Sequence, residues 1–165
     1  MSSAALYHHV SSMQDLYGLM TEYVLRRAIP VHKDGQSWQD WFRGNAMKHR
    51  EAFMAHRDSG KVASLSIPST KMYSDLLPTL ISPLVAAGVA AHDALAANGA
   101  LGSLLLGSIL YEQHEEHRKR LAGLLPVAEA FRYGVDAIIA GTLEKTKSKK
   151  NGEDRIQVKS QRKVK

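Results

Sequence analysis

Cysteine is absent from the 165 residues, so disulfide bonds, thiol catalysis and cysteine-ligated metal clusters are excluded. Aromatic residues make up only 7% of the chain, and alternating patterns typical of strands are missing. No apolar run reaches the ~18–20 residues of a membrane span, because Leu104–Leu110 is already broken by Gly107 and Ser108. The first residues lack the basic-then-apolar order of a signal peptide. We therefore expect an all-α, cytoplasmic protein with no membrane partner.

The excess of positive charge is confined to the last part of the chain. The formal net charge is +6, but residues 145–165 carry nine Lys and Arg against two acidic residues. This segment also has few apolar residues, so we expect residues 147–165 to form a disordered basic tail. Such a tail could contact nucleic acid without sequence selectivity, or it could act only as a solubilising segment.

Helix start and stop signals predict about seven helices. Ser12 and Ser37 each stand three residues before an acidic residue, which is the form of a helix N-cap. Pro78 and Pro83 each remove a backbone donor, so each indicates a kink or a helix start. The expected helices cover residues 2–10, 13–29, 38–56, 61–65 (a short helix or a turn), 70–87, 92–117 and 127–144, with residues 118–125 as a connector.

Two of these helices are candidates for a helix–helix interface. The helix over 92–117 is rich in Ala, Gly and Ser, which lower helix propensity and are tolerated where another element packs close to the backbone. The helix over 127–144 carries an aliphatic stripe that includes Val135 and Ile139. Duplicated about a two-fold axis, the pair would form a four-helix dimer core. Packing within one chain is the alternative.

One N-terminal block resembles a known family. Residues 4–10 (Ala-Ala-Leu-Tyr-His-His-Val) and 12–16 (Ser-Met-Gln-Asp-Leu) resemble the end of the helix-turn-helix in tetracycline-repressor-like (TetR family) regulators. The similarity continues through residues 37–40, 56–58 and 134–144, and it covers residues 3–146. It implies a TetR-like helical bundle with a dimerising four-helix core. Residues 1–29 would be the remnant of a truncated helix-turn-helix domain, and residues 30–146 the ligand-binding and dimerisation domain.

The resemblance also implies where DNA would be contacted. In an intact reading head the residues facing DNA would be Ser3, Ala4, Tyr7, His8 and His9. Complete family members carry roughly 35 residues before this helix, including the helix that braces it against the groove. Met13 stands where the family places a Lys that contacts phosphate. We therefore expect weak or absent sequence-specific DNA binding for the chain as written, and operator binding if the N-terminus is completed.

A ligand cavity inside the helical core is a further implication. The resemblance places nine residues at it: Asn45, His49, Ser66, Ile67, Thr79, Leu95, Asn98, Tyr111 and His114. The tetracycline-responsive branch holds its drug as a magnesium chelate through a His and a Glu, and this chain has Ala63 and Tyr111 at those positions. Neither residue is a magnesium ligand. We expect no metal site, no cofactor and an apolar or aromatic inducer.

Catalysis is not indicated by any motif. The sequence shows no nucleophile–base–orienter set and no Gly-rich phosphate loop, so we do not expect an enzyme. His114 and His117 lack the His-Glu-x-x-His spacing of zinc proteases, and we interpret them as part of a solvated helix C-terminus.

Two functional hypotheses remain. The first is a ligand-responsive, homodimeric transcriptional repressor of the TetR kind. The second is a ligand-binding or dimerisation module without its own DNA binding, which would act by pairing with an intact homologue.

Overall fold

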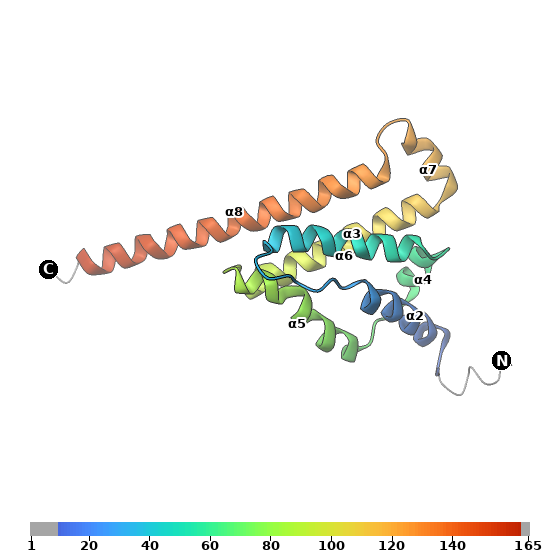
Figure 1. Cartoon of the computed structure of the whole chain (residues 1–165), viewed down its shortest axis with the longest axis horizontal. Helices are drawn as coiled ribbons and strands as arrows, with labels where there is room; N and C mark the ends of the chain where they lie inside the picture. The colour runs from blue at the N-terminus through green and yellow to red at the C-terminus, as the bar shows by residue number, and fades with distance from the viewer. Residues whose placement is uncertain (1–9, 163–165) are drawn as a thin grey trace.

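The computed structural model describes the backbone of residues 10–162 and the side chains of residues 10–149. Over these residues the chain is all-helical, as the sequence predicted, with seven helices and no strand (Figure 1). The expected helix over 2–10 and the candidate DNA contacts Ser3, Ala4, Tyr7, His8 and His9 lie outside the described residues. The helices are α2 (Met13–Ala28), α3 (Trp38–Met54), α4 (Ser59–Leu65), α5 (Thr70–Ala86), α6 (Ala91–Gln113), α7 (Glu115–Ala122) and α8 (Val127–Arg162).

Three of the helix starts are set by hydroxyl caps. The Ser12 side chain accepts from the Asp15 backbone N–H at 3.0 Å, and Ser37 accepts from Asp40 at 3.1 Å. Ser69 caps α5 in the same way, since its hydroxyl oxygen accepts from the Met72 backbone N–H. The Glu22 carboxylate of α2 in turn accepts from the backbone N–H and the hydroxyl of Ser69. These caps satisfy backbone donors that would otherwise lack partners. The predictions at Ser12 and Ser37 are confirmed.

The core lies between α3, α6 and α8, and α6 is its central element. The fully buried large side chains of the core include Trp41 and Phe42 from α3, Ile109 from α6 and Phe131 from α8. The carboxylate of Glu112 on α6 pairs with Arg50 of α3 beside this core. By length and composition α6 is apolar enough to cross a membrane, a test that core helices also pass, and here it packs against α3, α4, α5 and α8.

The expected continuous helix over 92–117 and the connector over 118–125 are corrected by the structure. α6 ends at Gln113, and α7 begins at Glu115. His114 between them has extended backbone angles (φ −87°, ψ 107°), and it is the N-cap of α7. Glu115 and Glu116 occupy the first turn of α7 and Lys119 and Arg120 the last, an order that suits the helix dipole. His114 therefore ends α6 and begins α7, and His117 lies in the first turn of α7.

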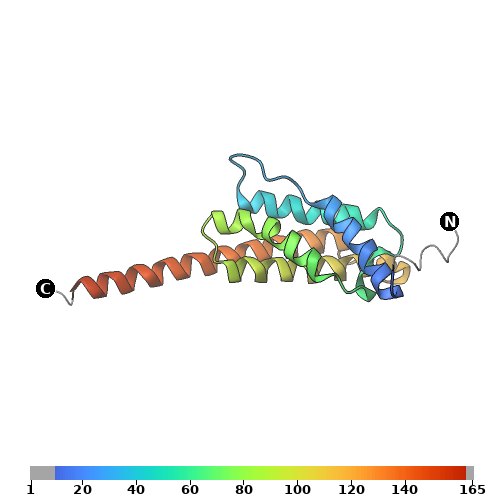
Figure 2. The ribbon, with the colours of Figure 1, turned by 90° about the horizontal axis from the view of Figure 1, so that it is seen from below.

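The structure describes residues 147–162 of the expected tail as part of a helix. α8 continues to Arg162 and projects beyond the other helices at the C-terminal end of the bundle (Figures 1 and 2). Lys, Arg and Gln are good helix formers, and extending an existing helix needs no new nucleus. Lys149 of this extension donates to the carboxylate of Asp93, at the start of α6, at 2.6 Å. The Lys149–Asp93 contact fixes the direction in which α8 leaves the bundle.

Candidate ligand-binding site

A cavity of about 570 Å³ opens between α3, α5 and α6. This volume lies within the range of small-molecule sites in proteins. Most of its lining is aliphatic, and it contains no Asp, Glu, Lys or Arg. The lining residues are Leu25, Asn45, His49, Met72, Tyr73, Leu76, Leu77, Leu80, Leu95, Asn98, Gly99, Leu101, Gly102, Ser103, Leu105 and Leu106.

Helical spacing explains how α5 and α6 present these side chains. Met72, Leu76 and Leu80 stand four residues apart, so they share one face of α5. Leu95, Asn98 and Gly102 stand three and four residues apart, so they share one face of α6. Because Gly102 has no heavy atom within 4 Å of where a Cβ would be, this side of α6 is left open to the cavity.

Asn45 is the most buried polar side chain of the cavity. It lies on α3 and is 2% exposed, and its Oδ1 atom has no hydrogen-bond partner in the described part of the chain. An unsatisfied buried polar group costs about 1–3 kcal/mol. Such a group is satisfied by an ordered water or by a ligand, so Asn45 is one candidate for a ligand contact.

His49 follows one helical turn after Asn45 and is also buried. Its Nδ1–H donates to the backbone carbonyl of Asn45 at 2.9 Å. Burial lowers the pKa of His49 below its ordinary value, and the backbone carbonyls of Asn45 and Leu25 oppose this effect only in part. The imidazole is therefore neutral at neutral pH.

Asn98 connects the two helices that form the other walls. Its Nδ2 donates to the backbone carbonyl of Ala94 within α6 at 3.0 Å and to that of Leu80 on α5 at 3.4 Å. Both amide hydrogens are thus directed to the protein, and its carbonyl oxygen is left as the group available to a ligand.

Four of the nine residues predicted for the ligand site line this cavity: Asn45, His49, Leu95 and Asn98. Within one chain the structure does not bring the other five to it. Ser66 and Ile67 lie in the connector after α4, where Ser66 donates to the carbonyl of Ala63 and Ile67 is 70% exposed. Thr79 is exposed on α5.

Tyr111 and His114 lie at the far end of α6. The Tyr111 ring stacks on His117 with centroids 5.1 Å apart, and His114 and His117 are 4.6 Å apart. Tyr111 also lines a separate cavity of about 370 Å³ between α6, α7 and α8. Contact between Tyr111 or His114 and a ligand stays a prediction.

The aliphatic side chains that α5 contributes to the cavity were not predicted, and Thr79 was the one residue of this helix expected there. The apolar residues at 72, 76 and 80, with 73 and 77 beside them, form a stripe at helical spacing that could have indicated it. Both prolines lie inside one helix, which agrees with the helix predicted over 70–87.

Gln113 connects the end of α6 to the α3–α4 corner. Its Oε1 accepts from the Gly60 backbone N–H at 3.0 Å, and its Nε2 donates to the His56 carbonyl and to the Ser59 hydroxyl. Gly60 allows this close approach, because a Cβ there would lie 2.9 Å from Ile109 Cγ2. The corner formed by α3 and α4 is thus held against the C-terminal end of a cavity helix.

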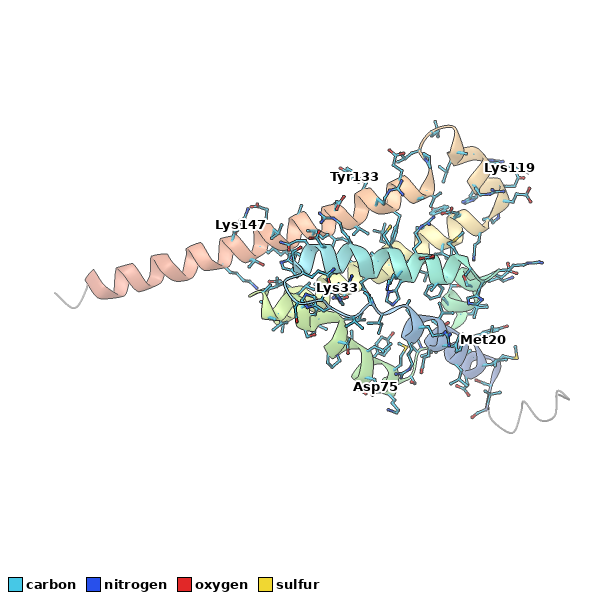
Figure 3. The ribbon with its side chains drawn as sticks, viewed as in Figure 1. Met20, Lys33, Asp75, Lys119, Tyr133 and Lys147 are labelled. Atoms are coloured by element: carbon cyan, nitrogen blue, oxygen red, sulfur yellow. The ribbon has the colours of Figure 1, made fainter. Side chains whose placement is uncertain are left out.

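A second groove, of about 560 Å³, lies between α2 and the α3–α4 corner and is lined by Met20, Thr21 and Phe53 among others. Figure 3 shows Met20 on α2, well away from Tyr133 on α8. Among the residues described, no group of three or more His, Asp and Glu side chains could hold a metal ion. Each of the two cavities has one buried oxygen without a partner among the described residues, Asn45 Oδ1 in the first and Thr21 Oγ1 in the second. We favour the α3–α5–α6 cavity because four of the residues predicted for the ligand site line it.

Comparisons with known proteins point to one class of regulator. No protein-family model matches the chain. Tetracycline repressor protein class D of Escherichia coli is 33% identical over 120 residues, which are 70% of this chain and 53% of that protein. The class H repressor of Photobacterium damsela subsp. piscicida matches to the same extent. The chain therefore spans about half the length of the curated relatives it matches.

Solved structures show the same fold. A TetR variant of Acinetobacter baumannii AYE in complex with minocycline superposes with a TM-score of 0.74 and 24% identity, over 88% of this chain and 80% of that one. The TetR family protein ActR of Streptomyces coelicolor, in complex with actinorhodin, gives a TM-score of 0.72 at 21% identity, over 88% and 83%. The fold is that of TetR-family regulators. In sequence, the chain is similar to tetracycline repressors over 70% of its length.

Proposed function

We propose that this chain is the regulatory core of a ligand-responsive, TetR-like transcriptional repressor, and that a small-molecule inducer occupies the α3–α5–α6 cavity. The unpartnered, buried Asn45 Oδ1 in an otherwise aliphatic cavity is the observation that carries the proposal. The relatives favour this function over a module that acts only by pairing with a homologue. Operator contacts from Ser3, Ala4, Tyr7, His8 and His9, together with a cytoplasmic location, belong to the same proposal.

Exposed faces of α6 and α8 support a homodimer. Tyr133 is 77% exposed and projects from the outer side of α8 (Figure 3), and Tyr111 of α6 is 50% exposed. Gly107 and Gly141 have no heavy atom within 4 Å of a Cβ position, so packing within the chain does not explain why they are small. A second copy approaching these faces would use the small residues and cover the apolar ones.

A reporter experiment tests the proposed function. The DNA upstream of the gene is fused to luciferase in cells that lack the gene and then receive this chain. The expected result is repression that an inducer relieves, and a Gly102→Trp variant that represses but no longer responds. Expression that is unchanged both by the chain and by the chain fused to the helix-turn-helix domain of a tetracycline repressor would contradict the proposal.

The reporter detects regulation whether the chain contacts DNA itself or acts through a homologue. A mobility-shift experiment with the purified chain and the same DNA separates these cases. Retardation that survives an excess of unrelated DNA assigns operator contact to this chain, and its absence alongside repression favours pairing with an intact homologue.

A further inference from the structure

The last part of α8 carries the chain's excess of positive charge. Residues 145–165 contain nine Lys and Arg against two acidic residues, whereas the rest of the chain contains thirteen against fourteen. At the described base of this segment, Lys145, Lys147 and Lys149 are all exposed. The formal charges of the molecule therefore nearly cancel except at one strongly basic end.

This basic end stands clear of the bundle. α8 continues as a helix to Arg162, and in two perpendicular views no other described helix lies beside its last turns (Figures 1 and 2). Among the described side chains, the ion pair of Lys149 with Asp93, at 2.6 Å, connects the base of this end to α6. Beyond that ion pair the helix is accessible to a large partner.

Cationic residues recur at helical spacing along the projecting part. Arg155, Lys159 and Arg162 stand four and three residues apart, so their positions share one face of α8. The adjacent acidic position, Asp154, is turned about 100° around the helix from Arg155. The three cationic positions extend over about 10 Å of the helix axis, a length over which duplex DNA presents about six phosphates.

Composition distinguishes between the polyanions that could bind such a helix. A helix that lies in a membrane surface requires a broad apolar face, but Ile156, Val158 and Val164 are the only large apolar residues of the segment 145–165. Single-stranded nucleic acid is bound through stacking on aromatic side chains, and this segment contains no aromatic residue. Contact with the phosphates of a duplex requires only cations at suitable spacing.

We propose that the projecting end of α8 binds the phosphate backbone of duplex DNA without sequence selectivity. Figure 1 shows α2, which follows the residues proposed to contact the operator, at the other end of the bundle. The contact is therefore separate from operator recognition, and the inference goes beyond the proposed function without depending on it.

Fluorescence anisotropy of a short labelled DNA duplex of arbitrary sequence, titrated with the full chain, tests this contact. The triple variant Arg155→Gln/Lys159→Gln/Arg162→Gln removes three charges and keeps good helix formers. Each phosphate contact that is lost lowers the slope of log affinity against log salt by about one. Between about 50 and 200 mM salt, the slope of the variant is expected to be shallower by about three, with at least tenfold weaker binding at the lower salt concentration.

A second triple variant controls for net charge. Lys33→Gln/Lys48→Gln/Lys61→Gln removes the same charge from exposed positions on the body of the protein. It is expected to bind the duplex as the wild-type chain does and with the same salt dependence. An unchanged thermal unfolding midpoint shows that each variant is folded.

Several outcomes would overturn the inference. A wild-type chain that does not bind the duplex at about 50 mM salt, or variants that both bind like the wild-type chain, would leave the segment as a solubilising tail. Equal weakening in both variants would assign the binding to net charge. Release of the duplex by phosphatidylserine vesicles of equal anionic charge would assign this end to a lipid surface. None of these results bears on repression or on the ligand cavity, which the reporter experiment tests.

Discussion

Gly60 shows at the scale of one residue how closely the α3–α4 corner approaches α6. A Cβ at this position would lie 2.9 Å from Ile109 Cγ2, 3.2 Å from the Leu110 nitrogen and 3.3 Å from Gln113 Oε1. The Leu110 nitrogen is backbone and cannot rotate away. Any side chain at Gly60 therefore pushes the corner off α6 and weakens the hydrogen bonds of Gln113.

Gly60→Ala is accordingly expected to lower the free energy of unfolding by about 1–3 kcal/mol, the usual cost of overpacking. Gly44→Ala is the matched control, because Gly44 has open space around it in the middle of α3. This control should raise stability by roughly 0.5–1 kcal/mol through helix propensity. Urea unfolding measures both. Equal effects of the two substitutions would show that the corner is not tightly packed.

His49 supplies a pH dependence at the same scale. Its pKa is lowered in the folded chain mainly by burial, whereas the unfolded chain binds a proton with the ordinary pKa of about 6.5. The unfolded state therefore gains the extra proton as the pH falls. The contribution of His49 to stability is complete above pH ~6.5 and is lost progressively below that value.

His49→Asn removes this titration while keeping a side-chain donor. Between pH 8 and pH 5, the unfolding midpoint of the wild-type chain is expected to fall further than that of the variant. The other histidines are present in both proteins, so their contributions cancel from the comparison. A parallel decline in the two proteins would mean that His49 is protonated in the folded state.

At the scale of elements, much of the helix pattern could be read from the chain. Ser12 and Ser37 cap the helices as predicted, since capping needs only residues close in sequence. The break between α6 and α7 at His114 could not be predicted in this way. Gln113, the last residue of α6, is held by the backbone of Gly60, which is distant in sequence. The cavity was half predicted: Asn45, His49, Leu95 and Asn98 lie at it, but the α5 wall follows from how α5 crosses α6.

Among the described side chains, Lys149 connects the base of the α8 extension to Asp93 at the start of α6. Lys149 donates to Asp93, and this hydrogen bond is the main reason why the pKa of the Asp93 carboxyl is lowered. Because the folded pKa lies below the unfolded value, the contact is complete above pH ~4 and is lost as the pH falls below it. It therefore stabilises the base of the extension at neutral pH.

Lys149→Ala is expected to speed amide hydrogen exchange in residues 146–162 at neutral pH. Lys147→Ala is a matched control two residues away, because Lys147 contacts only Glu144 of its own helix at 3.4 Å among the described residues. Mass spectrometry of proteolytic peptides from both variants reports the difference. Equal exchange in the two variants would show that Asp93 does not anchor the extension.

At the scale of the whole molecule, the exposed faces of α6 and α8 define the proposed dimer. Gly107→Arg places a long charged side chain where one chain leaves open space, so the fold of the protomer should survive. Light scattering after size-exclusion chromatography is expected to show a dimer for the wild-type chain and a monomer for this variant. Gly44→Arg, at a glycine with equal space on α3, should remain dimeric. A wild-type chain that elutes as a monomer would contradict the dimer.

The central claim is that the α3–α5–α6 cavity binds a small molecule, and one titration tests it most directly. Gly102 lines the cavity and has no heavy atom within 4 Å of a Cβ position, so the side chain of Gly102→Trp has space to begin there and is expected to occupy part of the cavity. With the fluorescent ring compound 1-pyrenemethanol as the probe, we expect saturable binding to the wild-type chain and to a Gly44→Trp control. Binding to Gly102→Trp is expected to be at least tenfold weaker. Equal affinity of all three proteins would contradict it.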